Sequence, residues 1–352
     1  MFSRVVLGGG KDTCRLGRLK LSLGSPLGGR LSIDFEPDET ESALSDSLRA
    51  LCRQHCPENL AREVAGVFPR DLWAALSEFG LFALATPDGF GGVVEIEAAG
   101  DILGSFVAPG PLAPTFFAVH ALPAGEEREA VIAGETVVSL GRPPLMPWFG
   151  VASVFLSVRG DRVVKFEEPG EIEQVATLSG EPWSRLMLGP EKDLGSAAHP
   201  CALYDVFVAA YLVGAARKLV KEAAEYVANR RQFGKTLSQF QAISHPLAES
   251  SIRVRAAGGL ARLAAHQVDL GLERAYATAQ SARISAENAA LKAINVCHQS
   301  YGAMGMTEEG PVAYVSRRLR QLVNHEFSDV PRVSSIEQQY NEHMPALLVV
   351  AR

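Results

Sequence analysis

Three short motifs contain the residues of this sequence that are best suited to binding a ligand. They span residues 230–235 (RRQFGK), 240–243 (FQAI) and 299–305 (QSYGAMG). In each, a long helical pattern meets a turn in which guanidinium groups, side-chain amides or bare backbone N–H groups come together. Such groups at a helix end are what a phosphate requires. The motifs therefore predict a site for a phosphate-bearing cofactor.

Composition excludes several other classes of function. The chain has 352 residues, 47% of them hydrophobic, which is enough for two or three domains with a substantial core. The formal net charge of −6 argues against a nucleic-acid binder, which needs a basic face. The sequence contains no run of 18 apolar residues, so we expect no membrane insertion.

The cysteines indicate a reducing compartment. They are odd in number and scattered, at Cys14, Cys52, Cys56, Cys201 and Cys297. Cys52 and Cys56 are four residues apart in a helical pattern, but no second pair lies at the spacing of metal ligands. We therefore expect free thiols and a cytoplasmic protein, with neither zinc nor a disulfide framework.

The first half of the chain changes character twice. Residues 1–30 are cationic and rich in glycine, without the apolar core of a secretory signal, and we interpret them as a leader or a disordered tail. Residues 31–133 have a helical pattern. Residues 134–202 are rich in β-branched and aromatic residues, and segments 152–158 and 163–166 predict a β-hairpin. We expect a helical N-terminal domain followed by a small β domain.

The remainder, residues 203–352, positions the three motifs. Long amphipathic patterns cover residues 206–229, 239–271 and 272–298, with short turns at Gly234 and Gly271. Long antiparallel helices joined by short turns are typical of a helix bundle. The predicted fold is therefore mostly α with a small β domain, and its C-terminal part is a four-helix bundle.

The motifs and this order of domains resemble the acyl-CoA dehydrogenase family of flavoproteins over residues 32–327. The resemblance implies that the bundle lends its Arg-x-x-Phe-Gly turn to the FAD of a neighbouring subunit. By matching position, Arg230 would contact the pyrophosphate, and Phe233 would pack near the adenosine. The other matching residues would complete this end of the site; they are Gln232, Gln241, Gln299, Gly302, Ala303 and Gly305.

The resemblance also implies a reaction, the α,β-dehydrogenation of an acyl-CoA thioester. A carboxylate would remove the α-proton, the flavin would accept the β-hydride, and an electron-transfer flavoprotein would receive the electrons. Counting along the family pattern places the base at Glu326, but Phe327 and Ser328 replace its usual glycine and threonine. The alternative family position for the base corresponds to Tyr204, which cannot serve.

The β region departs further from the family. Family members have a loop and a Trp-containing strand that hold the isoalloxazine ring, whereas this chain has residues 139–144 (SLGRPP) there and only about 65 residues of β region. We interpret Trp148 and Trp183 as core residues. The ring end of the cofactor site looks eroded, while the phosphate end looks intact.

Three hypotheses follow for the function. The first is a subunit of a heteromeric, FAD-dependent acyl-CoA dehydrogenase that completes the flavin site of a second dehydrogenase subunit, with bulky steroid-derived thioesters as one candidate class of substrate. The smaller subunits of some bacterial enzymes of this kind resemble this chain. The second is a self-sufficient dehydrogenase that uses Glu326. The third is a non-catalytic helical scaffold that has lost flavin.

Overall fold

The computed structural model describes residues 19–22, 30–33, 35–57, 60, 67–87, 89–167, 169–272 and 274–330. The chain divides into two compact units, Met1–Asp38 and Glu39–Arg352. In the first unit, strands β1 (Leu19–Ser22) and β2 (Arg30–Ile33) form an antiparallel hairpin. The rest of the segment that we interpret as a leader or a disordered tail lies outside the described residues, so that interpretation stays a prediction.

The second unit begins with a group of helices. They are α1 (Glu39–His55), α3 (Arg70–Glu78), the 3-10 helix η1 (Leu81–Ala83), α4 (Val93–Ser105), α5 (Leu112–Ala121) and α6 (Glu126–Ile132). The Gly92 N–H donates to the Glu95 carboxylate at 2.6 Å. Asp269, at the end of a bundle helix, accepts from the N–H groups of Val93 and Val94 at 2.7 and 3.1 Å. Two carboxylates therefore satisfy the free donors at the start of α4.

The β region forms two small sheets. Its strands are β3 (Val137–Leu140), β4 (Leu145–Pro147), β5 (Ala152–Arg159), β6 (Arg162–Phe166), β7 (Gly170–Val175), β8 (Trp183–Met187) and β9 (Glu191–Ser196). One sheet has the order β3-β5-β6-β9, and the other has the order β4-β8-β7. The hairpin expected from the sequence is confirmed as β5 and β6, and the turn between them contains Gly160 at φ +57°.

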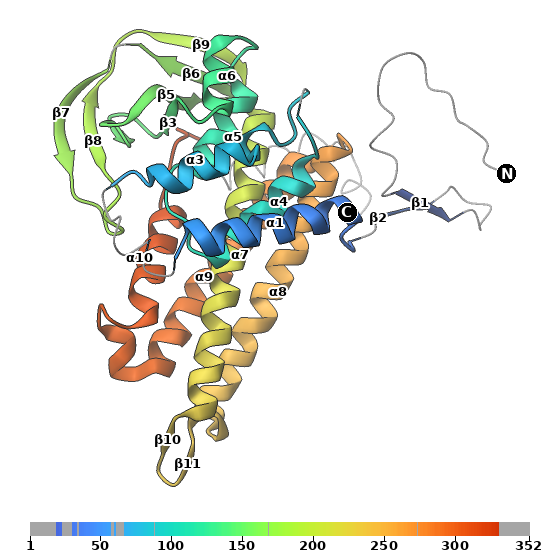
Figure 1. Ribbon diagram of the computed structural model, residues 1–352, viewed down its shortest axis with the longest axis vertical. Helices are drawn as coiled ribbons and strands as arrows, with labels where there is room; N and C mark the ends of the chain where they lie inside the picture. The colour runs from blue at the N-terminus through green and yellow to red at the C-terminus, as the bar shows by residue number, and fades with distance from the viewer. Residues whose placement is uncertain are drawn as a thin grey trace, which may run out of the picture. The chain divides into compact units, whose positions relative to one another are not determined.

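The bundle follows as long helices with short connections. Its elements are α7 (Ala198–Asn229), β10 (Arg231–Gln232), β11 (Lys235–Thr236), the 3-10 helix η2 (Leu237–Gln239), α8 (Gln241–Asp269), α9 (Ala275–Tyr301), the 3-10 helix η3 (Gly302–Met306) and α10 (Pro311–Val323). Figure 1 shows α7, α8 and α9 side by side, with the shorter α10 against them. The predicted mostly helical fold with a small β part is confirmed.

Helix α7 is the centre of the second unit. It packs against α9, α8, α4 and α5, and most of its side chains are buried. Glycines let α4 approach it closely: a Cβ at Gly104 would strike the carbonyl of Tyr211, and a Cβ at Gly214 would strike that of Asp101. Among the described residues, no helix is long and apolar enough to cross a membrane.

Because α4 and α7 touch at glycines, we predict that alanine at the contact destabilises the protein, although glycine to alanine in a helix usually stabilises it. Glycine to alanine in an exposed helix interior stabilises by roughly 0.5–1 kcal/mol. Gly259→Ala in α8, where a methyl group would meet no described atom within 4 Å, should behave in this way. Gly214→Ala should instead lower the free energy of unfolding by about 1–3 kcal/mol, because the two backbones must separate. Urea denaturation of both variants tests this, and a stabilised Gly214→Ala protein would contradict it.

Candidate functional site

The three sequence motifs meet at one end of the bundle, which we call the bundle tip. The last turns of α7 and α9 adjoin there, since the rings of Tyr226 and Tyr301 stack with centroids 4.6 Å apart. The Leu237 N–H donates to the Arg230 carbonyl at 2.8 Å and closes the connection that leads to α8. In Figure 1, β10 and β11 mark this tip, at the opposite end of the bundle from the strands of the β region.

The tip carries a tight hairpin with an exposed aromatic ring. β10 and β11 pair Arg231 with Thr236 and Gln232 with Lys235, and the turn between them has φ +53° at Phe233 and φ +80° at Gly234. Two successive positive φ angles are those of a type I′ turn, which favours asparagine and glycine. Phe233 is 89% exposed in this strained conformation. Strain at an exposed ring that packs poorly on its own chain suggests a contact with another molecule.

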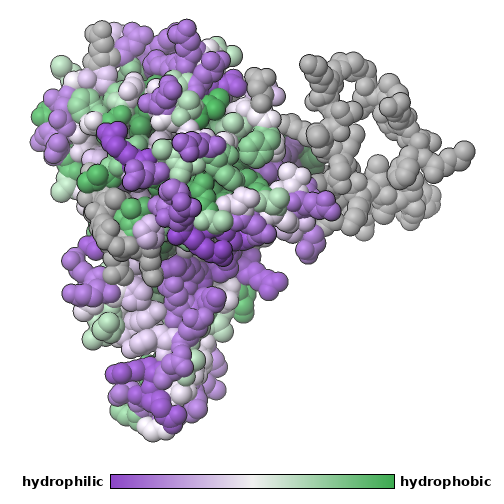
Figure 2. Space-filling model, in the orientation of Figure 1, coloured by the Kyte–Doolittle hydropathy of each residue, from purple (hydrophilic) through white to green (hydrophobic). Residues whose placement is uncertain are grey.

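The other tip residues expected to contact a cofactor are also mostly on the surface. Those that are exposed are Arg230, Gln232, Gln241, Gln299, Gly302 and Ala303. Gly305 is buried, and a Cβ there would lie 2.6 Å from the carbonyl oxygen of His298. Figure 2 shows mainly hydrophilic side chains over this end of the molecule. The structure therefore brings the motifs at the end of α7 and the start of α8 together, with the end of α9 against the last turns of α7, and the roles of these residues stay predictions.

Glu326, the expected base, lies elsewhere. Its carboxylate pairs with Arg142 Nη1 at 2.9 Å, and the two side chains are 65% and 54% exposed. Its neighbours in the sequence, His325 and Phe327, are both buried. The backbone here thus turns the carboxylate toward solvent, while an imidazole and a phenyl ring face the interior.

His325 joins the bundle to the β region. Its Nε2 lies 2.8 Å from the Leu140 carbonyl oxygen, and its Nδ1 lies 2.9 Å from the Tyr204 hydroxyl. Because a carbonyl oxygen only accepts, Nε2 carries the proton and Nδ1 accepts from the tyrosine. Burial lowers the pKa of His325 to about 4, so the imidazole is neutral at physiological pH.

A fully buried arginine lies beside this pair. Arg283 donates to Asp205 at 2.9 Å and to Glu287 at 3.0 Å, and its guanidinium carbon is 5.0 Å from the centre of the Tyr204 ring. A third contact, 3.4 Å long, reaches the His325 carbonyl. Burial works to lower the pKa of Arg283, but the nearby carboxylate of Asp205 outweighs it, and the net pKa lies above its usual value.

Aromatic rings fill the remaining interior. The Phe327 ring is 4.5 Å from that of Tyr204 and 5.7 Å from that of Phe117, measured between centroids. The Phe327 carbonyl accepts from the Val158 N–H at 2.9 Å and from the Ser157 hydroxyl at 3.1 Å. The cavity lined by Tyr204 and His325 measures only about 20 Å³. One water would fit in that volume, but an isoalloxazine ring or an acyl chain would not.

Sequence reasoning missed the buried charges of this region. Arg283 is followed by Glu287 one helical turn later, which is a detectable ion-pair signal. Nothing in the sequence showed that the pair would be buried against Asp205. A similar cluster holds Arg318, which binds Glu181 and donates to the Gly110 carbonyl at 3.1 Å. Trp148, which we expected in the core, is buried; Trp183 is partly buried, with its ring 5.4 Å from that of His325.

The neutral His325 predicts a pH dependence of stability. The unfolded imidazole titrates near its usual pKa of about 6.5, whereas the folded one stays neutral down to about pH 4. Stability should therefore be lost as the pH falls through this window, by an amount on the order of 3 kcal/mol. His325→Gln, which keeps a donor and an acceptor, should reduce this loss. Urea unfolding between pH 4 and pH 7 measures it, with the exposed His245→Gln as control; identical curves for wild type and His325→Gln would contradict the prediction.

Comparison with known proteins is consistent with this architecture. The N-terminal part, residues 38–107, matches the model of the acyl-CoA dehydrogenase N-terminal domain. Residues 206–323 match the model of the acyl-CoA dehydrogenase C-terminal domain. Between them the two matches leave out residues 108–205, which include the whole β region. The departure from the family pattern that we found in the sequence falls in this part.

One curated relative and two solved structures illustrate the similarity. The chain is 32% identical over 119 residues to the 3-(aryl)acrylate reductase of Clostridium sporogenes, which covers 34% of this chain and 31% of that protein. The chain therefore spans about a third of the length of that relative. A variant of the Tcur3481–Tcur3483 steroid ACAD superposes with a TM-score of 0.75 at 21% identity, covering 86% of this chain and 98% of the other. The ChsE4–ChsE5 complex from Mycobacterium tuberculosis gives 0.74 at 21%, covering 89% and 100%.

Proposed function

This chain belongs to the acyl-CoA dehydrogenase family, and on that premise we propose that it is a subunit of a heteromeric, FAD-dependent acyl-CoA dehydrogenase. Its bundle tip contacts the pyrophosphate and adenosine of an FAD whose ring is held by a second, unlike dehydrogenase subunit. Its own interior takes no part in the chemistry. The enzyme would oxidise an acyl-CoA thioester and pass electrons to an electron-transfer flavoprotein.

The observation that carries the proposal is the filled interior beside Tyr204. Leu140 belongs to the segment that would hold the flavin ring, and His325 adjoins the expected base. The two are joined directly by a hydrogen bond of 2.8 Å. A ring system could enter only if this bond and the packing of Phe327 were broken. The residues present therefore do not fit the redox end of FAD.

The tip fits the other end of the cofactor. Arg230 has a guanidinium fork suited to a pyrophosphate, and among the described residues it makes no ion pair. Gln241 is the first residue of α8, whose free N–H groups attract an anion. The flavin, when bound, would supply the hydride acceptor. This chain would supply charge, hydrogen-bond donors and the Phe233 ring at the phosphate and adenosine end.

The separation of the two ends supports a site that is shared between subunits. Tyr204 and Arg230 lie near opposite ends of α7, about 40 Å apart at 1.5 Å per residue. One extended dinucleotide is too short to reach both. A tip residue must therefore act on the cofactor of another subunit. The two structural neighbours support an unlike partner, because one is a complex of two differently named proteins and the other pairs two components in a steroid enzyme.

Flavin content tests the proposal. We expect the chain expressed alone to be colourless, and the chain co-expressed with a neighbouring acyl-CoA dehydrogenase gene to give an active complex with flavin absorbance. Arg230→Ala should weaken flavin binding in the complex by roughly tenfold to a hundredfold, since a charge-assisted hydrogen bond is worth about 1.5–3 kcal/mol. Arg185→Ala in β8, which also removes an exposed arginine, is the control. Yellow, active protein from this chain alone would disprove the proposal.

The same complex separates the two rival hypotheses. Glu326→Gln should leave turnover unchanged, because an exposed pair with Arg142 contributes at most about 1 kcal/mol and the carboxylate faces solvent. Loss of turnover by orders of magnitude with flavin retained would instead identify a self-sufficient dehydrogenase with Glu326 as its base. Unchanged flavin content in Arg230→Ala would favour a scaffold that has lost flavin. Steady-state rates on steroid-derived and straight-chain acyl-CoA thioesters would define the substrate.

A further inference from the structure

A groove on the second unit, distinct from the bundle tip and from the filled interior, has a volume of about 630 Å³. It lies between the C-terminal ends of α1 and α4 on one side and the C-terminal half of α7 and the first turn of α10 on the other. We call it the cationic groove. Its lining residues that the argument uses are Arg53, Phe106, Arg217, Lys218, Lys221 and Tyr314, together with the carboxylates of Glu222 and Glu225.

One face of α7 forms its long wall. Its residues form two neighbouring rows at intervals of three and four, so they share one side of the helix; one row is Gly214, Arg217, Lys221 and Glu225, and the other is Gly214, Lys218, Glu222 and Glu225. Four cations line the groove against two carboxylates, in a chain whose formal net charge is −6. Positive charge is therefore concentrated in this groove although the net charge of the whole chain is negative. This excess of positive charge favours an anionic ligand.

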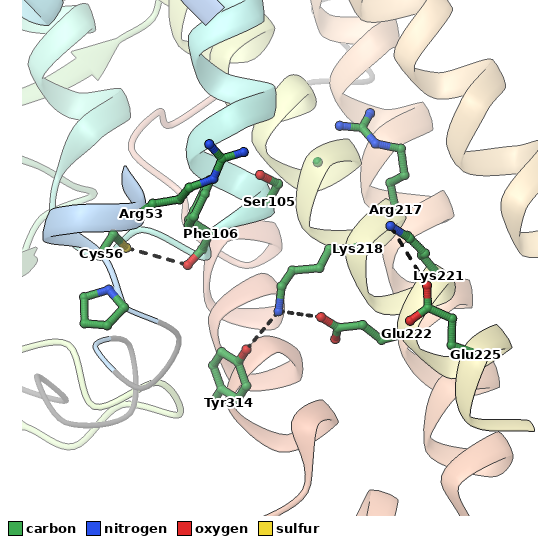
Figure 3. Close-up of a pocket in the computed structure, with 12 residues that line it drawn as sticks. Arg53, Cys56, Ser105, Phe106, Arg217, Lys218, Lys221, Glu222, Glu225 and Tyr314 are labelled. Atoms are coloured by element: carbon green, nitrogen blue, oxygen red, sulfur yellow. Dashed lines mark hydrogen bonds and ion pairs between the residues drawn. The ribbon is translucent and has the colours of Figure 1, made fainter. Parts of the chain in front are cut away.

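The two guanidinium groups lie apart from the two carboxylates, which pair with lysines. In Figure 3, Arg53 and Arg217 lie on opposite sides of the view, and the carboxylates of Glu222 and Glu225 lie below Arg217. Arg217 pairs with Asp101 at 2.5 Å, outside the lining. Among the described residues, Arg53 makes no ion pair or hydrogen bond. The groove thus offers two guanidinium groups, and that of Arg53 has no partner in the part of the chain that the structure describes.

The two carboxylates of the groove offer acceptors. Glu222 Oε1 binds Lys218 at 2.8 Å, but its Oε2 is buried and has no hydrogen-bond partner in the part of the chain that the structure describes. Lys221 holds Glu225 only loosely, at 4.0 Å. A buried carboxylate oxygen without a donor is destabilising, and a ligand hydroxyl or amino group could supply the missing hydrogen bond. The rings of Phe106 and Tyr314 also line the groove, Phe106 beside Arg53 and Tyr314 beside Lys218, whose Nζ is 3.5 Å from the Tyr314 hydroxyl.

A covalent ligand does not suit this groove. Its one thiol, Cys56, lies 3.7 Å from the Phe106 carbonyl. Burial raises the pKa of Cys56 to about 12, so the thiol stays protonated and unreactive. A ligand must therefore bind through the charges and the two rings.

We propose that the cationic groove binds a nucleoside phosphate. The phosphate would lie against Arg53 and Arg217, the base or sugar would contact Phe106 and Tyr314, and hydroxyl or amino groups would donate to Glu222. Guanidinium groups, two aromatic rings and a carboxylate oxygen without a donor line one groove, and together they suit a ligand that combines an anion, a flat ring and hydrogen-bond donors. The proposal is independent of the function assigned to the bundle tip.

Calorimetric titration of the purified chain with ADP tests it. We expect a dissociation constant on the order of 100 μM, weakened at least about tenfold by Arg53→Glu or Lys221→Glu and by raised salt. Both side chains are exposed, so both variants should fold. Lys192→Glu, an equal charge reversal on β9, should bind as wild type does. No heat with ADP at millimolar concentration, or equal affinity in the Arg53→Glu and control proteins, would overturn the proposal.

Two further titrations identify the part of the ligand that is recognised and the location of the site. Inorganic phosphate and adenosine should each bind at least about tenfold more weakly than ADP, since each uses only part of the groove. Phosphate that bound as tightly as ADP would show that the nucleoside is not recognised. ADP binding should persist in Arg230→Ala. Binding lost in Arg230→Ala but kept in Arg53→Glu would place ADP at the tip, which would refute the groove site while leaving the proposed function intact.

Discussion

The rest of the interior depends on one buried guanidinium. Arg283 lies fully buried between Asp205 of α7 and Glu287 of its own helix, with a further contact to the His325 carbonyl. Charges in such a position stay in a fold only when they are paired, and removing one partner of a buried pair costs about 3–5 kcal/mol. The guanidinium therefore holds α9, α7 and the segment after α10 in one arrangement. His325 extends that arrangement to β3 through its bond to Leu140.

This arrangement occupies the space in which a flavoprotein of the family would do its chemistry. Tyr204, His325 and Phe327 pack together where a base and a ring would be needed, and the β region is reduced to two small sheets. A volume that is filled with side chains at native density has no room for a ring system. Here the interior is packed, and the surface at the bundle tip carries the groups that the proposed function assigns to the phosphates.

The length and the packing of α7 determine where the bundle tip lies. A helix of 32 residues carries Arg230 far from the β region of its own subunit, and packing against α4, α8 and α9 keeps α7 straight enough to present the tip hairpin. Phe233 then projects from a strained turn with 89% of its surface exposed. The same helix lines the cationic groove with another of its faces. It therefore contributes residues to three regions, which are the packed interior, the bundle tip and the cationic groove.

The sequence by itself determined the type and order of the elements and the grouping of the tip motifs. Periodic apolar residues identified the bundle helices, and the β5–β6 hairpin was evident from its alternation and turn. The motifs at Arg230, Gln241 and Gln299 fall near helix ends because Gly234 and Gly302 interrupt the helical pattern beside them. These are local signals, carried by neighbours in the chain. Only the tertiary structure decided that Glu326 faces solvent while His325 faces inward, that Arg283 finds Asp205, and that α1, α4, α7 and α10 enclose a groove. Each of these depends on residues far apart in the chain, and burial and charge pairing across such distances leave no periodic trace in the sequence.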